Sequence, residues 1–171
     1  MLTKRLGVTD RENFYVFAYI GLILTLAQGM LVRRLIPKLG EFRMALAGVV
    51  MMTVGLFLIG QTANNGSLGL LVTFLPIVVV GFSATTPSLQ SMLSLSSGDD
   101  EQGEVLGVGQ SISSLARIAG PVAGMTRQAQ GIAYPYWFAS FLMALGILLV
   151  FRLKNVIKPG FTGTVGVTAS H

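Results

Sequence analysis

Five long apolar runs, joined by short polar connections, limit the folds open to this chain more than any other feature of its sequence. A helix needs about 20 mainly apolar residues to cross the hydrocarbon core of a bilayer. The runs that meet this criterion cover residues 13–32, 44–60, 68–93, 105–125 and 132–151. The sequence therefore predicts an all-α integral membrane protein with five transmembrane helices.

The low content of charged residues supports this prediction. Only 11% of the 171 residues are charged, whereas a soluble domain carries about 25%, so the chain cannot cover a water-facing surface. We expect residues 1–154 to form one helical bundle. Residues 155–171 are rich in Gly, Thr and Val, and we expect them to form a disordered cytoplasmic tail.

Charge and motif content argue against several functional classes. The net charge is +5, but the basic residues cluster beside the apolar runs and form no stripe that would bind a nucleic acid. The chain has no cysteine, and its single histidine, His171, would be a lone metal ligand. It contains no catalytic or nucleotide-binding motif. We therefore expect no enzymatic activity, no metal, no cofactor and no nucleic-acid partner.

The distribution of Lys and Arg predicts the orientation in the membrane, because cytoplasmic connections are enriched in them. Five spans would place Lys4, Arg5, Arg11 and Arg127 on one side of the bilayer. The opposite side would hold Arg33, Arg34, Lys38, Arg43, Arg152, Lys154 and Lys158. The sequence thus predicts a multi-pass protein of the inner (plasma) membrane with a cytoplasmic C-terminus.

The run at 105–125 has a polar face made of small residues. At about 100° per residue, that face covers an arc of about 140°. It holds Gly103, Gly107, Gln110, Ser113, Ser114, Arg117, Gly120, Pro121 and Gly124. Small residues four positions apart let helix backbones approach closely. Gly103, Gly107, Gly120, Pro121 and Gly124 are therefore a candidate helix-packing motif.

Arg117 is the one charged residue well inside a predicted span. An arginine near the bilayer centre costs about 2.5–3.5 kcal/mol on insertion scales, so it should face protein or a water-filled cavity. Two interpretations remain open at this point. Arg117 could contact an anionic substrate or control a proton relay, or it could tie helices together through carbonyls and hydroxyls.

Other polar residues within the runs are further candidates for a transport cavity. Thr86 and Gln90 share one face of the run at 68–93, and Gln28 lies near the end of the first run. Together with Arg117, Gln110 and Ser114, these three residues are the candidates for lining a transport cavity. Ordinary helix packing would explain the same residue types. All seven acidic residues lie outside the runs, so a proton-coupling carboxylate would have to come from elsewhere.

Three segments together resemble the second half of a major facilitator superfamily carrier, specifically its eighth to twelfth helices. The stretch Gly29 to Arg34, followed by Gly40 to Arg43, is similar to the basic cytoplasmic signature between the eighth and ninth helices. Arg33 stands where the strong form of that signature has an Asp. The run Gly81–Leu89 resembles the tenth helix, and the stretch from Ser114 to Gly124 resembles the eleventh. The whole looks most like drug:proton antiporters of the tetracycline-efflux type.

The resemblance implies a function and a limit on it. Such carriers bind their substrate between two halves near the bilayer midplane. The chain would then be part of a secondary active transporter that exports small amphipathic molecules, inactive without an N-terminal half. The cytoplasmic loop motif would consist of Gly29, Arg33, Arg34, Gly40 and Arg43. The alternative is a small membrane subunit that acts through helix–helix assembly and transports nothing.

Overall fold

A computed structural model describes residues 10–63, 68–98, 100–128, 131 and 133–156. All regular structure in these residues is helical, which confirms the all-α prediction. The elements are α2 (Asp10–Leu26), η1 (Ala27–Val32), α3 (Arg33–Leu39), α4 (Glu41–Ala63), α5 (Leu68–Ser96), α6 (Gln102–Gln128) and α7 (Tyr134–Val156). Here η1 is a π-helical segment that continues α2. Residues 157–171 of the predicted tail lie outside the described residues.

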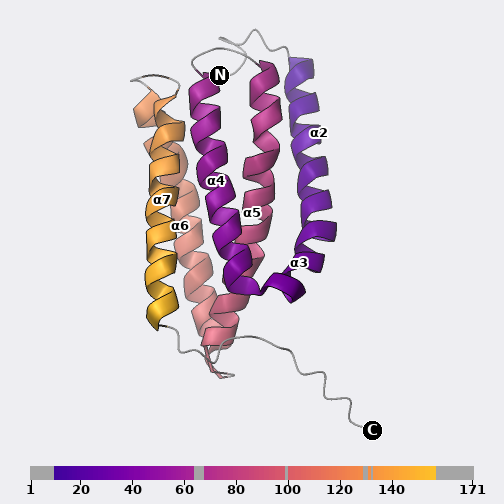
Figure 1. Ribbon diagram of the computed structural model, residues 1–171. Coiled ribbons are helices and arrows are strands. Elements are labelled where there is room, and N and C mark those ends of the chain that lie inside the picture. The colour runs from indigo at the N-terminus through magenta and orange to yellow at the C-terminus, as the bar shows by residue number, and fades with distance from the viewer. Residues whose placement is uncertain (1–9, 64–67, 99, 129–130, 132, 157–171) are drawn as a thin grey trace.

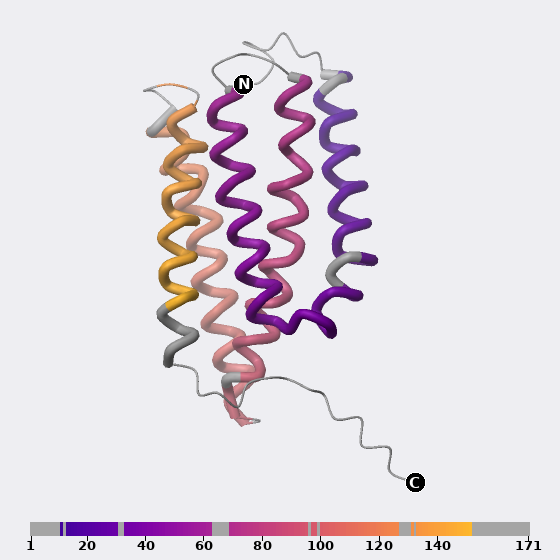
Figure 2. Tube along the Cα trace, in the orientation of Figure 1, coloured from indigo at the N-terminus to yellow at the C-terminus, as the bar shows by residue number. Residues whose placement is uncertain are grey.

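The long helices form an up-and-down bundle (Figure 1). Figure 2 shows the path of the chain, which descends through α2, rises through α4, descends through α5, rises through α6 and descends through α7. Consecutive long helices are therefore antiparallel, as short connections require. The connections between the helices therefore lie alternately at the two ends of the bundle.

The five apolar runs all fall on long helices, with ends within a few residues of the predicted ones. Within the described residues, four segments are long and apolar enough to cross a membrane: Asn13–Met30, Glu41–Thr62, Gly69–Leu95 and Tyr134–Phe151. The 27-residue helix α6 is long enough, but its Gly, Ser, Gln and Arg residues keep it out of this group. The assignment of α6 as a fifth span therefore stays a prediction.

Helix α4 occupies the centre of the bundle and packs against α5 on one side and α7 on the other. Small residues make these contacts close. A Cβ added to Gly55 would meet the Val78 side chain of α5, and one added to Gly60 would meet the ring of Trp137 of α7. Small residues at helix interfaces are how membrane helices gain packing contacts when lipid offers the same hydrophobicity as a neighbour.

One hydrogen bond between side chain and backbone joins α7 to α4. The Ser140 hydroxyl donates to the Thr53 carbonyl oxygen at 2.9 Å. Several other hydroxyls instead donate to a carbonyl one turn back in their own helix, as buried Ser83 does to Val79 at 2.7 Å. This local pairing satisfies the hydroxyl without a partner helix.

The connection at 33–43 is mostly helical, although it contains Pro37 and Gly40, two residue types that disfavour a helix interior. Helix α3 runs through Pro37 and ends at Leu39, directly before Gly40, whose φ of 78° favours glycine. The half-buried side chains of Leu35 and Ile36 pack against a small core of Met44 and Ala84. The helix therefore lies against the lower end of α4 and α5.

Candidate functional site

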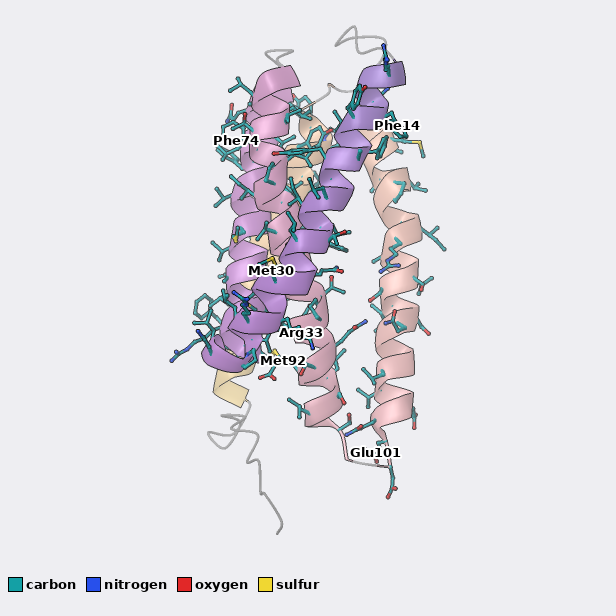
Figure 3. All side chains as sticks on the ribbon, turned by 90° about the vertical axis from the view of Figure 1, so that its right-hand side faces the viewer. Phe14, Met30, Arg33, Phe74, Met92 and Glu101 are labelled. Atoms are coloured by element: carbon teal, nitrogen blue, oxygen red, sulfur yellow. The ribbon has the colours of Figure 1, made fainter. Side chains whose placement is uncertain are left out.

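Helix α6 is the most exposed long helix of the bundle in its middle part. Every residue from 110 to 122 is exposed, on the polar and the apolar face alike. Ile112, Leu115 and Ile118 are 62%, 67% and 68% exposed. Figure 3 shows α6 at the edge of the bundle. This surface is therefore open to lipid, substrate or another protein.

The predicted cavity residues of α6 lie on this open surface. Gln110, Ser114 and Arg117 are all exposed. The Ser114 hydroxyl donates to the Gln110 carbonyl at 2.8 Å, within its own helix. Among the residues that the structure describes, none forms a hydrogen bond or ion pair with Arg117. A helix-tying role for Arg117 would therefore need a partner outside the described residues.

The other three cavity candidates lie on neighbouring helices. Thr86 is half-buried and Gln90 exposed on α5, while Gln28 is exposed in η1. Helix α2 with η1 packs beside α5, and α5 packs beside α6. The structure thus places the candidates on adjacent helices but does not gather them into an enclosed pocket. A π-helical turn such as η1 leaves backbone geometry irregular and occurs often at functional sites.

The four glycines of the predicted helix-packing motif on α6 do not pack against other helices in the described part of the chain. No atom lies within 4 Å of a Cβ added to Gly103, Gly107, Gly120 or Gly124, and Pro121 is exposed. The predicted helix-packing motif is thus not used inside the described bundle. The close contacts occur instead at Gly48, Gly55, Gly60 and Gly81, a spacing of small residues that the sequence shows but that sequence reasoning missed.

A hollow of about 400 Å³ lies between the end of α5 and the start of α6. Apolar side chains form most of it, and two carboxylates, Glu101 and Glu104, stand at its side. Gly109 allows this close approach, because a Cβ there would lie 3.1 Å from Leu93 Cδ1. Sequence reasoning missed this site: the acidic connection was visible, but only the fold brings it beside Leu93 of α5. The lining consists of Leu93, Glu101, Glu104, Val105, Val108, Gly109 and Ile112.

The predicted loop motif lies along the lower end of α2, α3 and α4. Gly29 falls in η1, Arg33 and Arg34 begin α3, Gly40 ends it, and Arg43 lies in the first turns of α4. The three arginines are exposed. Glu41, next to Gly40, is half-buried, and its Oε1 accepts a long hydrogen bond of 3.4 Å from Ser91 Oγ of α5.

A match to a protein-family model identifies the family of this chain. The model described as Major Facilitator Superfamily matches residues 1–121, well over half of the chain. The chain belongs to the major facilitator superfamily. It is therefore a membrane protein of a transporter family and not an enzyme, and its surroundings are a lipid bilayer. The family accounts for the up-and-down arrangement of long helices.

Individual relatives of this major facilitator chain include two multidrug resistance proteins. Multidrug resistance protein 2 of Bacillus subtilis (strain 168) is 28% identical over 153 residues, which are 88% of this chain and 37% of that protein. Multidrug resistance protein 1 of the same organism is 29% identical, over 88% of this chain and 38% of its own length. Major facilitator superfamily domain-containing protein 10 of Mus musculus is 31% identical, over 89% and 33%.

The chain thus spans between 33% and 38% of the length of these major facilitator relatives. No solved structure gives a significant match to it. The relationship to multidrug resistance proteins is distant, and it covers nearly all of this chain.

Proposed function

We propose that this chain supplies the eighth to twelfth helices of a drug:proton antiporter of the tetracycline-efflux type, which exports small amphipathic molecules. In this assignment α2 to α7 form most of the C-terminal half of the carrier. The polar face of α6, with Arg117, Gln110 and Ser114, lines the substrate path together with Thr86, Gln90 and Gln28. The chain does not transport on its own.

The open polar face of α6 carries the proposal. A membrane helix that bears an arginine must turn it toward protein or water, yet residues 110–122 are exposed on every side in this chain. A second half packed against α6 would enclose this face and leave a polar path between the halves, where such carriers bind substrate. The distant similarity to two multidrug resistance proteins supports the substrate class.

The hollow between α5 and α6 also suits an amphipathic molecule. Its apolar walls would hold a hydrophobic body, and the carboxylates of Glu101 and Glu104 would attract a positive group at its rim. The hollow lies at the lower end of the bundle, which we propose to be cytoplasmic because α3 and the end of α7 gather basic residues there. We propose the plasma membrane as the location.

A transport assay tests the need for a second half. The chain is reconstituted into proteoliposomes with an imposed proton gradient, and the movement of a lipophilic cationic dye is followed. We expect no transport above protein-free vesicles, because one half has nothing to move against. The positive control is Multidrug resistance protein 2 of Bacillus subtilis, prepared identically. Gradient-dependent dye movement by this chain alone would contradict the proposal.

An assembly role without transport is the alternative, and the unused glycines of α6 favour it. Gly103, Gly107, Gly120 and Gly124 have open space around them, as a helix-docking surface would. Cysteine crosslinking in membranes distinguishes the carrier from the assembly subunit. Gly107→Cys is the probe, and Gly21→Cys, on α2, is the control. A stoichiometric complex through α6 that binds no dye would favour the alternative. A complex with a separate N-terminal half that moves dye would favour the carrier.

A further inference from the structure

The short segment between the first two membrane-span candidates concentrates positive charge. One candidate ends at Met30 and the next begins at Glu41, so α3 must lie where the hydrocarbon core gives way to lipid headgroups. Residues 33–43 contain four basic residues and one acidic residue. The basic ones are Arg33, Arg34, Lys38 and Arg43, all exposed.

Helix α3 divides into a polar and an apolar arc. At about 100° per residue, the polar arc holds Arg33, Arg34, Pro37 and Lys38, and the apolar arc holds Leu35, Ile36 and Leu39. The contacts agree with this division, since Leu35 and Ile36 pack on the core while the charged side chains are exposed. The helix therefore turns its basic arc away from the bundle.

Leu39 differs from Leu35 and Ile36 because its side chain is not packed against the core. Its side chain is 41% exposed at the end of α3, directly before the turn at Gly40. An exposed leucine beside basic residues at headgroup depth is typical of interfacial segments, whose apolar side chains enter the acyl region while their charges stay among headgroups.

The positive charge of this segment is not balanced within the described part of the chain. The carboxylate of Glu41 is directed to Ser91, on α5. The acidic residues Asp100 and Glu101 belong to the connection between α5 and α6, and Glu104 lies in the first turn of α6. Figures 1 and 3 both place this connection and the start of α6 away from α3. Arg34 and Lys38, four residues apart on one helix, repel each other. An external anion would relieve this repulsion.

We propose that the basic arc of α3 is a binding site for anionic phospholipid headgroups. The lipid phosphate would lie between Arg34 and Lys38, where an arginine can give two parallel hydrogen bonds to it, and Leu39 would contact the acyl chains. Basic segments next to a span attract anionic lipids in this way. The proposal needs only that the chain is embedded in a membrane, and it holds whether or not the chain transports.

Native mass spectrometry of the full chain in detergent tests the site. Equal amounts of phosphatidylglycerol and phosphatidylcholine with identical acyl chains are added, and lipid adducts are compared. We expect the phosphatidylglycerol adduct to dominate. Each basic side chain near an anionic surface contributes about fivefold to binding, so Arg34→Gln with Lys38→Gln should weaken the adduct about 25-fold. The single variant Lys38→Gln should weaken it about fivefold.

A charge-matched control keeps the test specific. Arg11→Gln with Arg127→Gln removes the same charge at the opposite end of the bundle and should change the phosphatidylglycerol adduct less than about twofold. Circular dichroism at 222 nm identifies any variant that has lost its helices. Equal losses in both double variants, or no preference for phosphatidylglycerol, would overturn the proposal. So would a carbodiimide crosslink between Lys38 and Glu101 or Glu104, because the arc would then face an acidic segment of the protein.

Discussion

Gly48 of α4 and Gly81 of α5 lie so close together that a Cβ added to either would come within 2.7 Å of the other's carbonyl oxygen. The backbones of the two helices meet here, and the side chains of Thr85 and Met52 also lie against the two glycines. Close approach of this kind increases van der Waals contact between helices, which is the main attraction available in lipid. The contact of α4 with α5 is therefore the most sensitive part of the bundle to an added side chain.

We expect Gly81→Val to lower the free energy of unfolding by about 1–3 kcal/mol, because the added carbons overfill the contact. Unfolding by a denaturing detergent, followed by circular dichroism in mild micelles, measures the change. Gly21→Val is the matched control, since no atom lies within 4 Å of a Cβ at Gly21, and its effect should stay below about 0.5 kcal/mol. Equal effects of the two variants would show that this contact is not formed in solution.

The hydrogen bond from Ser140 to Thr53 should stabilise the contact of α7 with α4. Ser140→Ala leaves the Thr53 carbonyl without this donor, and we expect a loss of about 0.5–1.5 kcal/mol in the same unfolding experiment. Ser111→Ala provides the control, because the Ser111 hydroxyl donates at 2.9 Å to Gly107 in its own exposed helix. An unchanged stability of Ser140→Ala would argue against the bond.

Arg117 should determine how readily α6 inserts into a membrane. If α6 is a span, Arg117→Leu removes a cost of about 2.5–3.5 kcal/mol, and the inserted fraction in a translocon assay should rise accordingly. The comparison is Arg11→Leu, in the first turn of α2, where the side chain can reach the interface and the gain should be smaller. If Arg117→Leu leaves the inserted fraction unchanged, α6 lies outside the bilayer core.

Cysteine labelling can establish the orientation cleanly, because the chain contains no cysteine of its own. Lys38, in α3, and Gln61, near the end of α4, are both exposed and lie toward opposite ends of the bundle. In intact cells a membrane-impermeant maleimide should label Gln61→Cys, whereas Lys38→Cys should react only after permeabilisation. The cysteine-free parent provides the background. The reverse pattern would invert the proposed topology.

The positions of the helices could be predicted from the sequence with little error. The runs at 44–60 and 68–93, for example, lie within α4 and α5. In lipid the backbone has no water to bond, so a long apolar run must satisfy its own hydrogen bonds as a helix. The helical continuation through Pro37 could not be predicted in the same way, because it depends on the contact of Leu35 and Ile36 with Met44 and Ala84.

The candidate site was only partly predictable. The sequence identified Arg117, Gln110 and Ser114 as the polar face of one helix, because that face follows from the helical repeat alone. It could not show that Glu101 and Glu104 share a hollow with Leu93, because this depends on how α5 and α6 meet. It also suggested a packing motif on α6, which stays a prediction, and it did not indicate the close contact between Gly48 and Gly81.

The sequence by itself thus determined that the chain is a membrane bundle, where its helices lie and which residues are polar within them. Only the tertiary structure decided that α4 is central, that α6 is exposed along its middle and that α3 turns a basic arc outward. The physical reason lies in the solvent. Lipid and the protein interior are similarly apolar, so hydrophobicity does not show which face of a helix packs against its neighbours. The shapes of the facing residues determine this instead.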